Sequence, residues 1–165
     1  MMNEQQREEK LKSLCEWFWG RRGQSLGLAE SCTGGLLSSW ITSQPGVSSY
    51  FAGSVVGYSG AAKVGLLGVP RYALKSYGEV SVPVALYMAR GARKALNCHW
   101  SLSITGVAGP SGGSGDKPVG TVCFALCGPG VEKREKKYFD GDDRVKIQYQ
   151  SACYALELLL TTLKE

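Results

Sequence analysis

Three glycine-rich turns that carry hydroxyl or lysine side chains are the parts of this sequence most suited to chemistry. They lie at Ala29–Gly35, Gly57–Lys63 and Thr105–Gly113, and they read AESCTGG, GYSGAAK and TGVAGPSGG. Each turn directly follows an apolar run that is typical of a buried strand. Because ligands of open α/β sheets bind outside the carboxyl ends of the strands, we expect the three turns to converge on one pocket.

Ser31 follows a predicted strand and precedes a predicted helix, a position that suits either a nucleophile or a helix cap. With Cys32, Thr33, Gly34 and Gly35 it forms the start of that helix, where backbone N–H groups lack helical partners and carry positive partial charge. Such groups bind phosphate or stabilise an oxyanion. Nucleophile and cap stay open for Ser31, Thr33 is a second cap candidate, and Cys32 is a rival nucleophile.

A serine nucleophile needs a base, and the single histidine, His99, is a poor candidate. It precedes the strand predicted from Trp100, so we place it at the end of that strand opposite the turns. Lys63 is the natural alternative, because burial and a nearby helix amino terminus disfavour a charged lysine. Tyr58 and Ser59 on the same turn can relay or orient the proton. The alternative of a solvated helix lysine stays open.

The third turn opens a flexible loop that can hold an anion or close over a ligand. Thr105, at the strand end, is its strongest candidate contact, and Arg144 either clamps a phosphate or lies on the surface. The other candidate substrate-binding positions in this loop are Gly106, Gly109, Ser111, Gly112 and Gly113. Six cysteines, at 15, 32, 98, 123, 127 and 153, show no metal-site spacing, so we expect buried free thiols and no metal.

Hydrophobic periodicity predicts the elements that position these turns. We expect helices over about 4–20, from 36 to Pro45, over 61–67 and 82–96, and a last helix capped by Asp142 or Asp143. Ser81 is the predicted cap of the fourth. Strands are predicted at 25–29, 51–58, 100–107, 119–127 and 132–139, the last two as a hairpin turning at 128–130, while 71–77 is ambiguous or one helical turn. This order favours an α/β fold, a three-layer α/β/α sandwich with a mixed, mostly parallel sheet.

Length and composition favour one domain, residues 1–165, and exclude several classes of protein. The chain has 165 residues, of which 44% are hydrophobic and 20% charged, as in globular domains. A polar amino terminus and the lack of a long apolar run favour a cytoplasmic protein without a membrane partner. The net charge of +5 is mild and scattered, and Lys133–Lys137 resembles a solvated surface, so no nucleic-acid partner is expected.

Together these motifs closely resemble the CinA C-terminal domain family of competence/damage-inducible proteins. Beyond the three turns, the resemblance includes Leu66–Pro70, Tyr77–Ser81, Lys117–Val122 and Phe139–Arg144, and it extends from about Ser13 onward. The pair AESCTGG and TGVAGPSGG is highly specific for the family. Full-length CinA proteins also have a molybdopterin-binding-like domain, so we expect the stand-alone form here.

The resemblance implies an α/β/α fold and a nicotinamide mononucleotide (NMN) deamidase, which converts NMN and water to nicotinic acid mononucleotide and ammonia. By position, Ser31 would be the nucleophile and Lys63 the base, assisted by Tyr58. The phosphate would bind the Thr105–Gly113 segment with Arg144 or Lys117. The resemblance implies a homo-oligomer, a dimer or larger, and the reaction needs no cofactor.

The sequence departs from the family pattern at one position beside the base. The family motif Tyr-Ser-Asn reads Tyr-Ser-Gly here, so Gly60 lacks a hydrogen-bonding side chain near Lys63. The family also includes close paralogues without demonstrated deamidase activity. Two alternatives therefore stay open: a different amidohydrolase or nucleotide hydrolase, and a non-catalytic nucleotide-binding competence or damage-inducible accessory protein.

Overall fold

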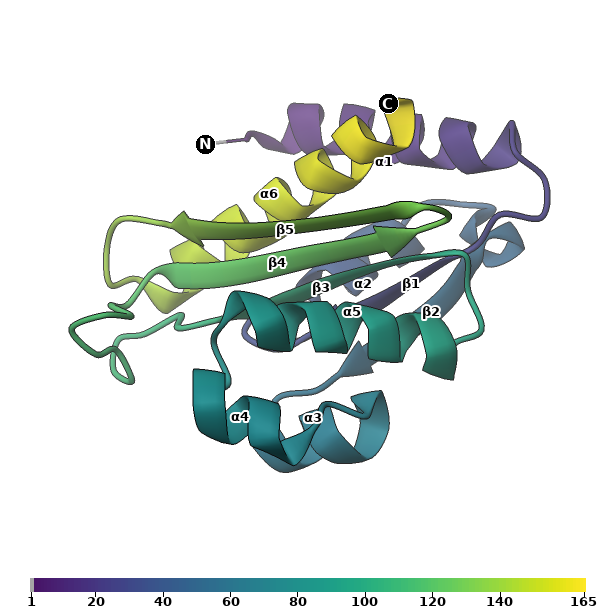
Figure 1. Cartoon of the computed structure of the whole chain (residues 1–165). Helices are drawn as coiled ribbons and strands as arrows, with labels where there is room; N and C mark the ends of the chain where they lie inside the picture. Colours follow the sequence, from purple (N-terminus) through teal and green to yellow (C-terminus); the bar gives the residue numbers. More distant parts are fainter. Residues whose placement is uncertain (1) are drawn as a thin grey trace.

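A five-stranded mixed sheet forms the middle layer of the molecule in a computed structural model that describes residues 2–165 (Figure 1). Its strands are β1 (Leu26–Glu30), β2 (Phe51–Val56), β3 (Trp100–Gly106), β4 (Thr121–Gly128) and β5 (Val131–Tyr138). The order across the sheet is β2-β1-β3-β4-β5. β1 is parallel to both its neighbours, whereas the β3–β4 and β4–β5 pairs are antiparallel. The predicted mixed sheet is confirmed, and β4 is the strand that runs against the others.

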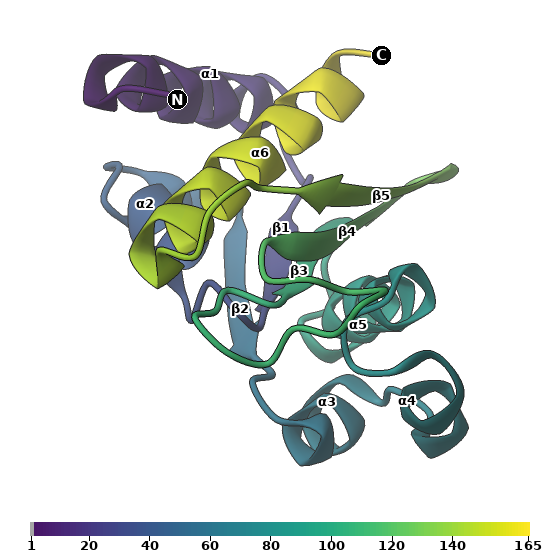
Figure 2. The same ribbon diagram turned by 90° about the vertical axis from the view of Figure 1, so that its left-hand side faces the viewer.

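Helices cover both faces of the sheet, which confirms the predicted three layers. They are α1 (Glu4–Trp19), α2 (Leu36–Thr42), α3 (Gly60–Leu67), α4 (Arg71–Tyr77), α5 (Val82–Ala95) and α6 (Arg144–Lys164), with a short 3₁₀ helix at Val47–Ser49. Figure 2 shows α1, α2 and α6 on one face and α5 on the other, with α3 and α4 beyond α5. No helix within residues 2–165 combines the length and the apolar character that a bilayer crossing requires.

The alternation of side chains along β4 explains how both helical layers are held. Every residue of the strand is buried. Alternate side chains belong to two clusters, Val122, Phe124 and Leu126 to the one with α6, and Cys123, Ala125 and Cys127 to the one with α5. β5 instead alternates between half-buried and exposed residues, so the Lys133–Lys137 cluster is the solvated surface that the sequence indicated.

A row of hydroxyls on one face of β3 binds the layer formed by α5. Ser101, Ser103 and Thr105 are buried and donate, over 2.7, 2.6 and 3.0 Å, to the main-chain carbonyls of Ala89, Ala85 and Glu79. Each buried hydroxyl therefore has an acceptor. The last of the three holds the segment before α5 against the carboxyl end of β3, which brings Glu79 to the edge of the sheet where the turns lie.

Helix ends and turns test the local predictions most closely. Ser81 and Asp143 are N-caps, as predicted, and accept from the N–H groups of Val84 and Lys146. Residues 71–77 form the seven-residue helix α4 rather than a single turn, because Ala73 is buried against the α5 layer. β4 continues through 128, so the hairpin turns over 129–130 alone.

Candidate active site

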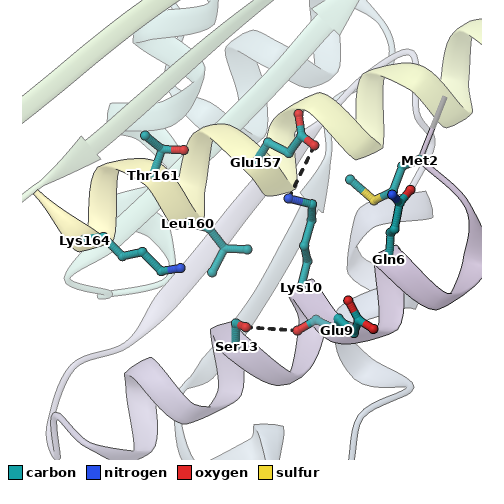
Figure 3. A pocket seen from close by; sticks show the side chains of 9 residues that line it. All are labelled: Met2, Gln6, Glu9, Lys10, Ser13, Glu157, Leu160, Thr161 and Lys164. Carbon is teal, nitrogen blue, oxygen red and sulfur yellow. Dashed lines mark hydrogen bonds and ion pairs between the residues drawn. The ribbon is translucent and has the colours of Figure 1, made fainter.

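Two cavities of the molecule differ in the chemistry of their walls. The larger, about 750 Å³, lies between α1 and α6 (Figure 3). Its polar walls contain the Lys10–Glu157 ion pair at 3.4 Å, and Ser13 in it donates to the main-chain oxygen of Glu9. The smaller, about 250 Å³, lies at the carboxyl ends of β1 and β3 and receives residues from all three glycine-rich turns. The turns thus converge as predicted, and the smaller cavity is the candidate active site.

Most of the residues selected from the sequence line this smaller cavity. Those present are Ser31, Cys32, Tyr58, Lys63, Thr105, Gly106, Gly109, Ser111, Gly112 and Arg144. Four lining residues were not singled out from the sequence, Glu79, Val80, Val107 and Ala108, although the last two belong to the third turn. Three of the four are apolar and carry no chemical signal in a sequence. Glu79 does carry one, because it lies in the Tyr77–Ser81 stretch of the family resemblance, but no role had been assigned to it.

Five selected residues lie outside the cavity walls. Thr33 donates its hydroxyl to Glu30, and together with Gly34 and Gly35 it lines a separate cavity beside α2 and α6. Ser59 is the N-cap of α3 and accepts from an N–H group of that helix. Gly113 follows the part of the loop that faces the cavity. The structure therefore gives Thr33 and Ser59 hydrogen bonds within the protein, and Lys117, which donates to the carbonyl of Tyr77, also lies outside.

Ser31 and Lys63 form a buried pair at the centre of the cavity. The Nζ atom of Lys63 lies 3.2 Å from Oγ of Ser31, and the two residues are 1% and 6% exposed. Lys63 is therefore not a solvated helix lysine. Nζ also lies 3.3 Å from the main-chain oxygen of Tyr58. A serine hydroxyl within hydrogen-bond reach of a buried amine is the geometry of a nucleophile with its base.

Glu79 supplies the counter-charge of this buried lysine. Its Oε2 lies 3.2 Å from Nζ of Lys63, and its side chain is 51% exposed. A buried ammonium is costly unless it is paired and hydrogen-bonded, and here a carboxylate, a hydroxyl and a carbonyl surround Nζ. Thr105 holds the Glu79 main chain in place. Glu79 is thus a member of the site that spacing alone did not identify.

Glu30 occupies the helix terminus that the sequence suggested for a ligand or an oxyanion. Its carboxylate is fully buried and accepts from Thr33 and Ser38 hydroxyls and from the N–H groups of Gly35, Leu37 and Ser38. Gly35 is the N-cap of α2 and makes no side-chain cap bond, so neither Ser31 nor Thr33 caps this helix. A carboxylate of the protein itself thus neutralises the helix terminus.

The N–H groups still available to a ligand lie one turn earlier. The N–H of Gly34 donates to the carbonyl of Ser31, and that of Gly35 to Glu30. In the part of the chain that the structure describes, the N–H groups of Cys32 and Thr33 donate to no other residue. The predicted oxyanion site, residues 32–35, is therefore narrowed to its first two residues.

Tyr58 and Arg144 join the second turn to the third. The Nη2 atom of Arg144 donates to the hydroxyl of Tyr58 over 2.5 Å, and Nη1 donates to the carbonyl of Gly109 over 2.6 Å. The Tyr58 hydroxyl therefore binds the guanidinium, while its main-chain carbonyl contacts Lys63. Arg144 lines the cavity rather than lying free on the surface. It places a positive charge in the wall of the pocket.

Cys32 lines the cavity but is unsuited to the role of rival nucleophile. Burial raises the pKa of its thiol to about 12, so the reactive thiolate is scarce at neutral pH. The six cysteines are all buried free thiols, as expected.

His99 is also excluded from the site, since its Nδ1 lies 2.9 Å from Oγ of Ser25 at the other end of the sheet. Within residues 2–165, no three His, Cys, Asp or Glu side chains are grouped to hold a metal.

Comparisons with known proteins agree with this architecture. Residues 8–163 match the CinA C-terminal domain family. A CinA-like protein of Anaeromyxobacter sp. is 45% identical over 95% of this chain and 38% of its own length, and one of Trichormus variabilis is 50% identical over 83% and 33%. This chain thus spans about a third of the length of these curated relatives.

Solved structures provide relatives of matching length. The competence/damage inducible protein CihA of Agrobacterium tumefaciens superposes with a TM-score of 0.91 at 33% identity, over 96% of both chains. The competence damage-inducible protein A of Klebsiella pneumoniae gives 0.91 at 29% identity, over 96% of this chain and 98% of its own. The order of elements, the three turns and these matches lead to one conclusion: this chain belongs to the CinA C-terminal domain family.

Proposed function

We propose that this protein is an amidohydrolase that deamidates nicotinamide mononucleotide. The observation that carries the proposal is the 3.2 Å contact between Nζ of Lys63 and Oγ of Ser31, both buried in a cavity at the carboxyl ends of the strands. A Ser–Lys pair performs nucleophilic acyl chemistry without histidine. The family resemblance supplies the substrate, a carboxamide on a nucleotide.

The reaction proceeds in two halves through an acyl-enzyme. Oγ of Ser31 attacks the carboxamide carbon while neutral Lys63 accepts the hydroxyl proton. The N–H groups of Cys32 and Thr33 are the donors that remain for the oxyanion. Lys63 then returns the proton to the departing amine, so that ammonia leaves. A water molecule, deprotonated by Lys63, hydrolyses the Ser31 ester and releases nicotinic acid mononucleotide.

The nucleotide phosphate binds beside Arg144. This residue is a cation of the cavity wall, and its guanidinium already contacts Tyr58 and the loop carbonyl of Gly109. Ser111 and Gly112 extend the loop beside it and add a hydroxyl and N–H groups. Tyr58 therefore assists the reaction from two sides, with its carbonyl on Lys63 and its hydroxyl on Arg144.

Ammonia release from NMN by the purified protein tests this function. Ser31→Ala and Lys63→Ala should each reduce kcat/KM by about 10³-fold or more, because nucleophile and base act as a unit. Ser48→Ala and Lys12→Ala change exposed residues away from the site and serve as matched controls with unchanged rates. Near-normal turnover by folded Ser31→Ala would refute the mechanism.

The accessory-protein alternative makes the opposite forecast in the same assay. It requires no ammonia release by the wild-type protein together with an increase in Tm when NMN is added. A panel of other amides and nucleotides separates a different hydrolase from a binding module. Release from another carboxamide that is lost in Ser31→Ala would keep the Ser–Lys chemistry and change the substrate.

A further inference from the structure

The carboxylate of Glu79 reaches Lys63 through space that a side chain at position 60 would fill. A Cβ atom at Gly60 would lie 2.8 Å from Oε1 and 3.3 Å from Cδ of Glu79. Gly60 is the first residue of α3, and its φ lies outside the left-handed region, so backbone conformation does not require glycine there. Glycine is also a poor helix former. What the missing side chain provides is room for the carboxylate.

We propose that Gly60 and Glu79 work as a pair, in which the absent side chain admits Glu79 as the counter-ion that positions Lys63. The inference rests on the Ser31–Lys63 pair of the proposed function. Glu79 stabilises the ammonium that forms when Lys63 takes the Ser31 proton, and it directs Nζ toward Oγ. Because this contact joins a carboxylate to the amine, we expect removal of the charge to change the acid limb of the pH–rate profile.

Several other charged or titratable groups lie around the site. Cys32 of the first turn is near the charges of Lys63, Glu30 and Arg144, and Tyr58 of the second turn joins Lys63 to Arg144. Glu30 is enclosed by its own donors, and Arg144 is bound to Tyr58 and the loop. Glu79 is the half-exposed carboxylate in direct contact with Nζ, so a side chain at position 60 displaces this group at little cost.

Two single variants and their combination test the pair. Glu79→Gln removes the charge, and Gly60→Ala keeps the carboxylate but moves it from Lys63. Gly65→Ala is the matched control for the second, since it lies in the same helix and its Cβ meets nothing within 4 Å. Glu16→Gln removes one exposed negative charge far from the site and controls for the first.

Two readouts separate this inference from the identity of the substrate. One is the pH dependence of NMN turnover. The other is the pH dependence of Ser31 labelling by an aromatic sulfonyl fluoride, followed by intact mass. In that reaction the Ser31 oxygen–sulfur bond forms, the sulfur–fluorine bond breaks, and the hydroxyl proton passes to Lys63 as fluoride leaves. Labelling needs the nucleophile and base but not the nucleotide.

We expect Glu79→Gln and Gly60→Ala each to move the acid limb of labelling to lower pH by about one unit, a shift moderated by solvent exposure of Glu79. The maximal rate should fall in both, because Gly60→Ala moves the acceptor away from Nζ and Glu79→Gln no longer stabilises the ammonium that forms. The double variant should move the limb no further than Glu79→Gln alone. Raising the salt concentration should move the acid limb of Ser31 labelling to lower pH in the wild type, because salt screens the Glu79 charge. The acid limb of Glu79→Gln should stay in place.

The outcomes decide between the proposals. An acid limb that stays in place in Glu79→Gln or Gly60→Ala, or additive shifts in the double variant, overturns the pairing. Shifted labelling without NMN turnover by the wild type keeps the pairing and refutes the substrate. No labelling of Ser31 in the wild type refutes the Ser–Lys pair and both proposals with it. If Glu79→Gln does not fold, Gly60→Ala carries the test, since it retains every charge.

Discussion

Two carboxylates flank the Ser31–Lys63 pair, and their surroundings differ completely. Glu30, at the end of β1, is fully buried and accepts hydrogen bonds from two hydroxyls and three backbone N–H groups. Glu79, before α5, is half exposed and contacts Lys63 through one oxygen. One precedes Ser31 in the chain and is enclosed by the protein, whereas the other contacts Lys63 and faces water.

The difference shows how one site combines rigidity with an adjustable charge. A carboxylate whose acceptor positions are filled by a helix terminus and two hydroxyls cannot move without breaking that helix start. A half-exposed carboxylate exchanges protein contacts for water at small cost. We therefore expect Glu30 to control whether the first turn forms, and Glu79 to control how the base behaves once the turns have formed.

Replacing Glu30 by glutamine should produce the largest loss of stability. Glu30→Gln replaces one acceptor oxygen by an NH₂ group that faces N–H and O–H donors. We expect the free energy of unfolding to fall by about 2–4 kcal/mol, because a charge-assisted buried network loses acceptors. Urea unfolding followed by circular dichroism measures this change. A loss within about 0.5 kcal/mol, the range typical of surface changes, would show that Glu30 is not the structural carboxylate.

Cys32, which lines the same cavity, should make stability depend on alkaline pH. Burial raises the pKa of its thiol to about 12 from an ordinary value of 9.0, so above pH 9 the unfolded chain releases a proton that the folded protein keeps. The unfolded state then binds fewer protons, and stability falls as pH rises from 9 toward 12. For this thiol the slope approaches about 1.4 kcal/mol per pH unit.

Urea titrations at several pH values between 8 and 11 measure that slope. Other buried thiols, such as Cys153, contribute in the same direction, so the decisive quantity is the difference between the wild type and Cys32→Ala. The free energy of unfolding of Cys32→Ala should fall less steeply with pH than that of the wild type, by the contribution of one thiol. Equal slopes in the two proteins would mean that Cys32 ionises in the folded state as readily as in the unfolded chain.

Glu79→Gln should produce the smallest change in stability. The glutamine oxygen still accepts from Lys63, and water reaches the exposed half of the side chain, so we expect a loss below about 1 kcal/mol. The same urea assay, run beside Glu30→Gln, makes the comparison direct. A loss as large as that of Glu30→Gln would show that Glu79 is a structural partner of Lys63 and would weaken its role in the pH profile.

Local sequence patterns predicted much of this architecture because their physics is local. Side-chain periodicity predicted nearly every helix and strand, and Ser81 and Asp143 cap helices through bonds that span only three residues. Ser31 and Lys63 were identifiable because turns that follow neighbouring parallel strands share one edge of a sheet. The choice of Lys63 over His99 also followed from position along a strand.

Contacts between distant segments were decided by the tertiary structure. Glu79 meets Lys63 because Thr105 and α5 bring the segment before α5 to the end of β3. The sequence placed Glu30 in the first turn without a role, yet it ends β1 and its side chain turns back to fill the start of α2.

The sequence by itself determined the order of elements, the turns and the positions of Ser31 and Lys63 at one edge of the sheet, because periodicity and chain direction require nothing beyond the neighbouring residues. Only the tertiary structure decided which carboxylate is enclosed and which faces water. Burial depends on what the rest of the chain places around a side chain. The sequence likewise did not explain Gly60, because the space that its missing side chain leaves is occupied by Glu79 only in the folded protein.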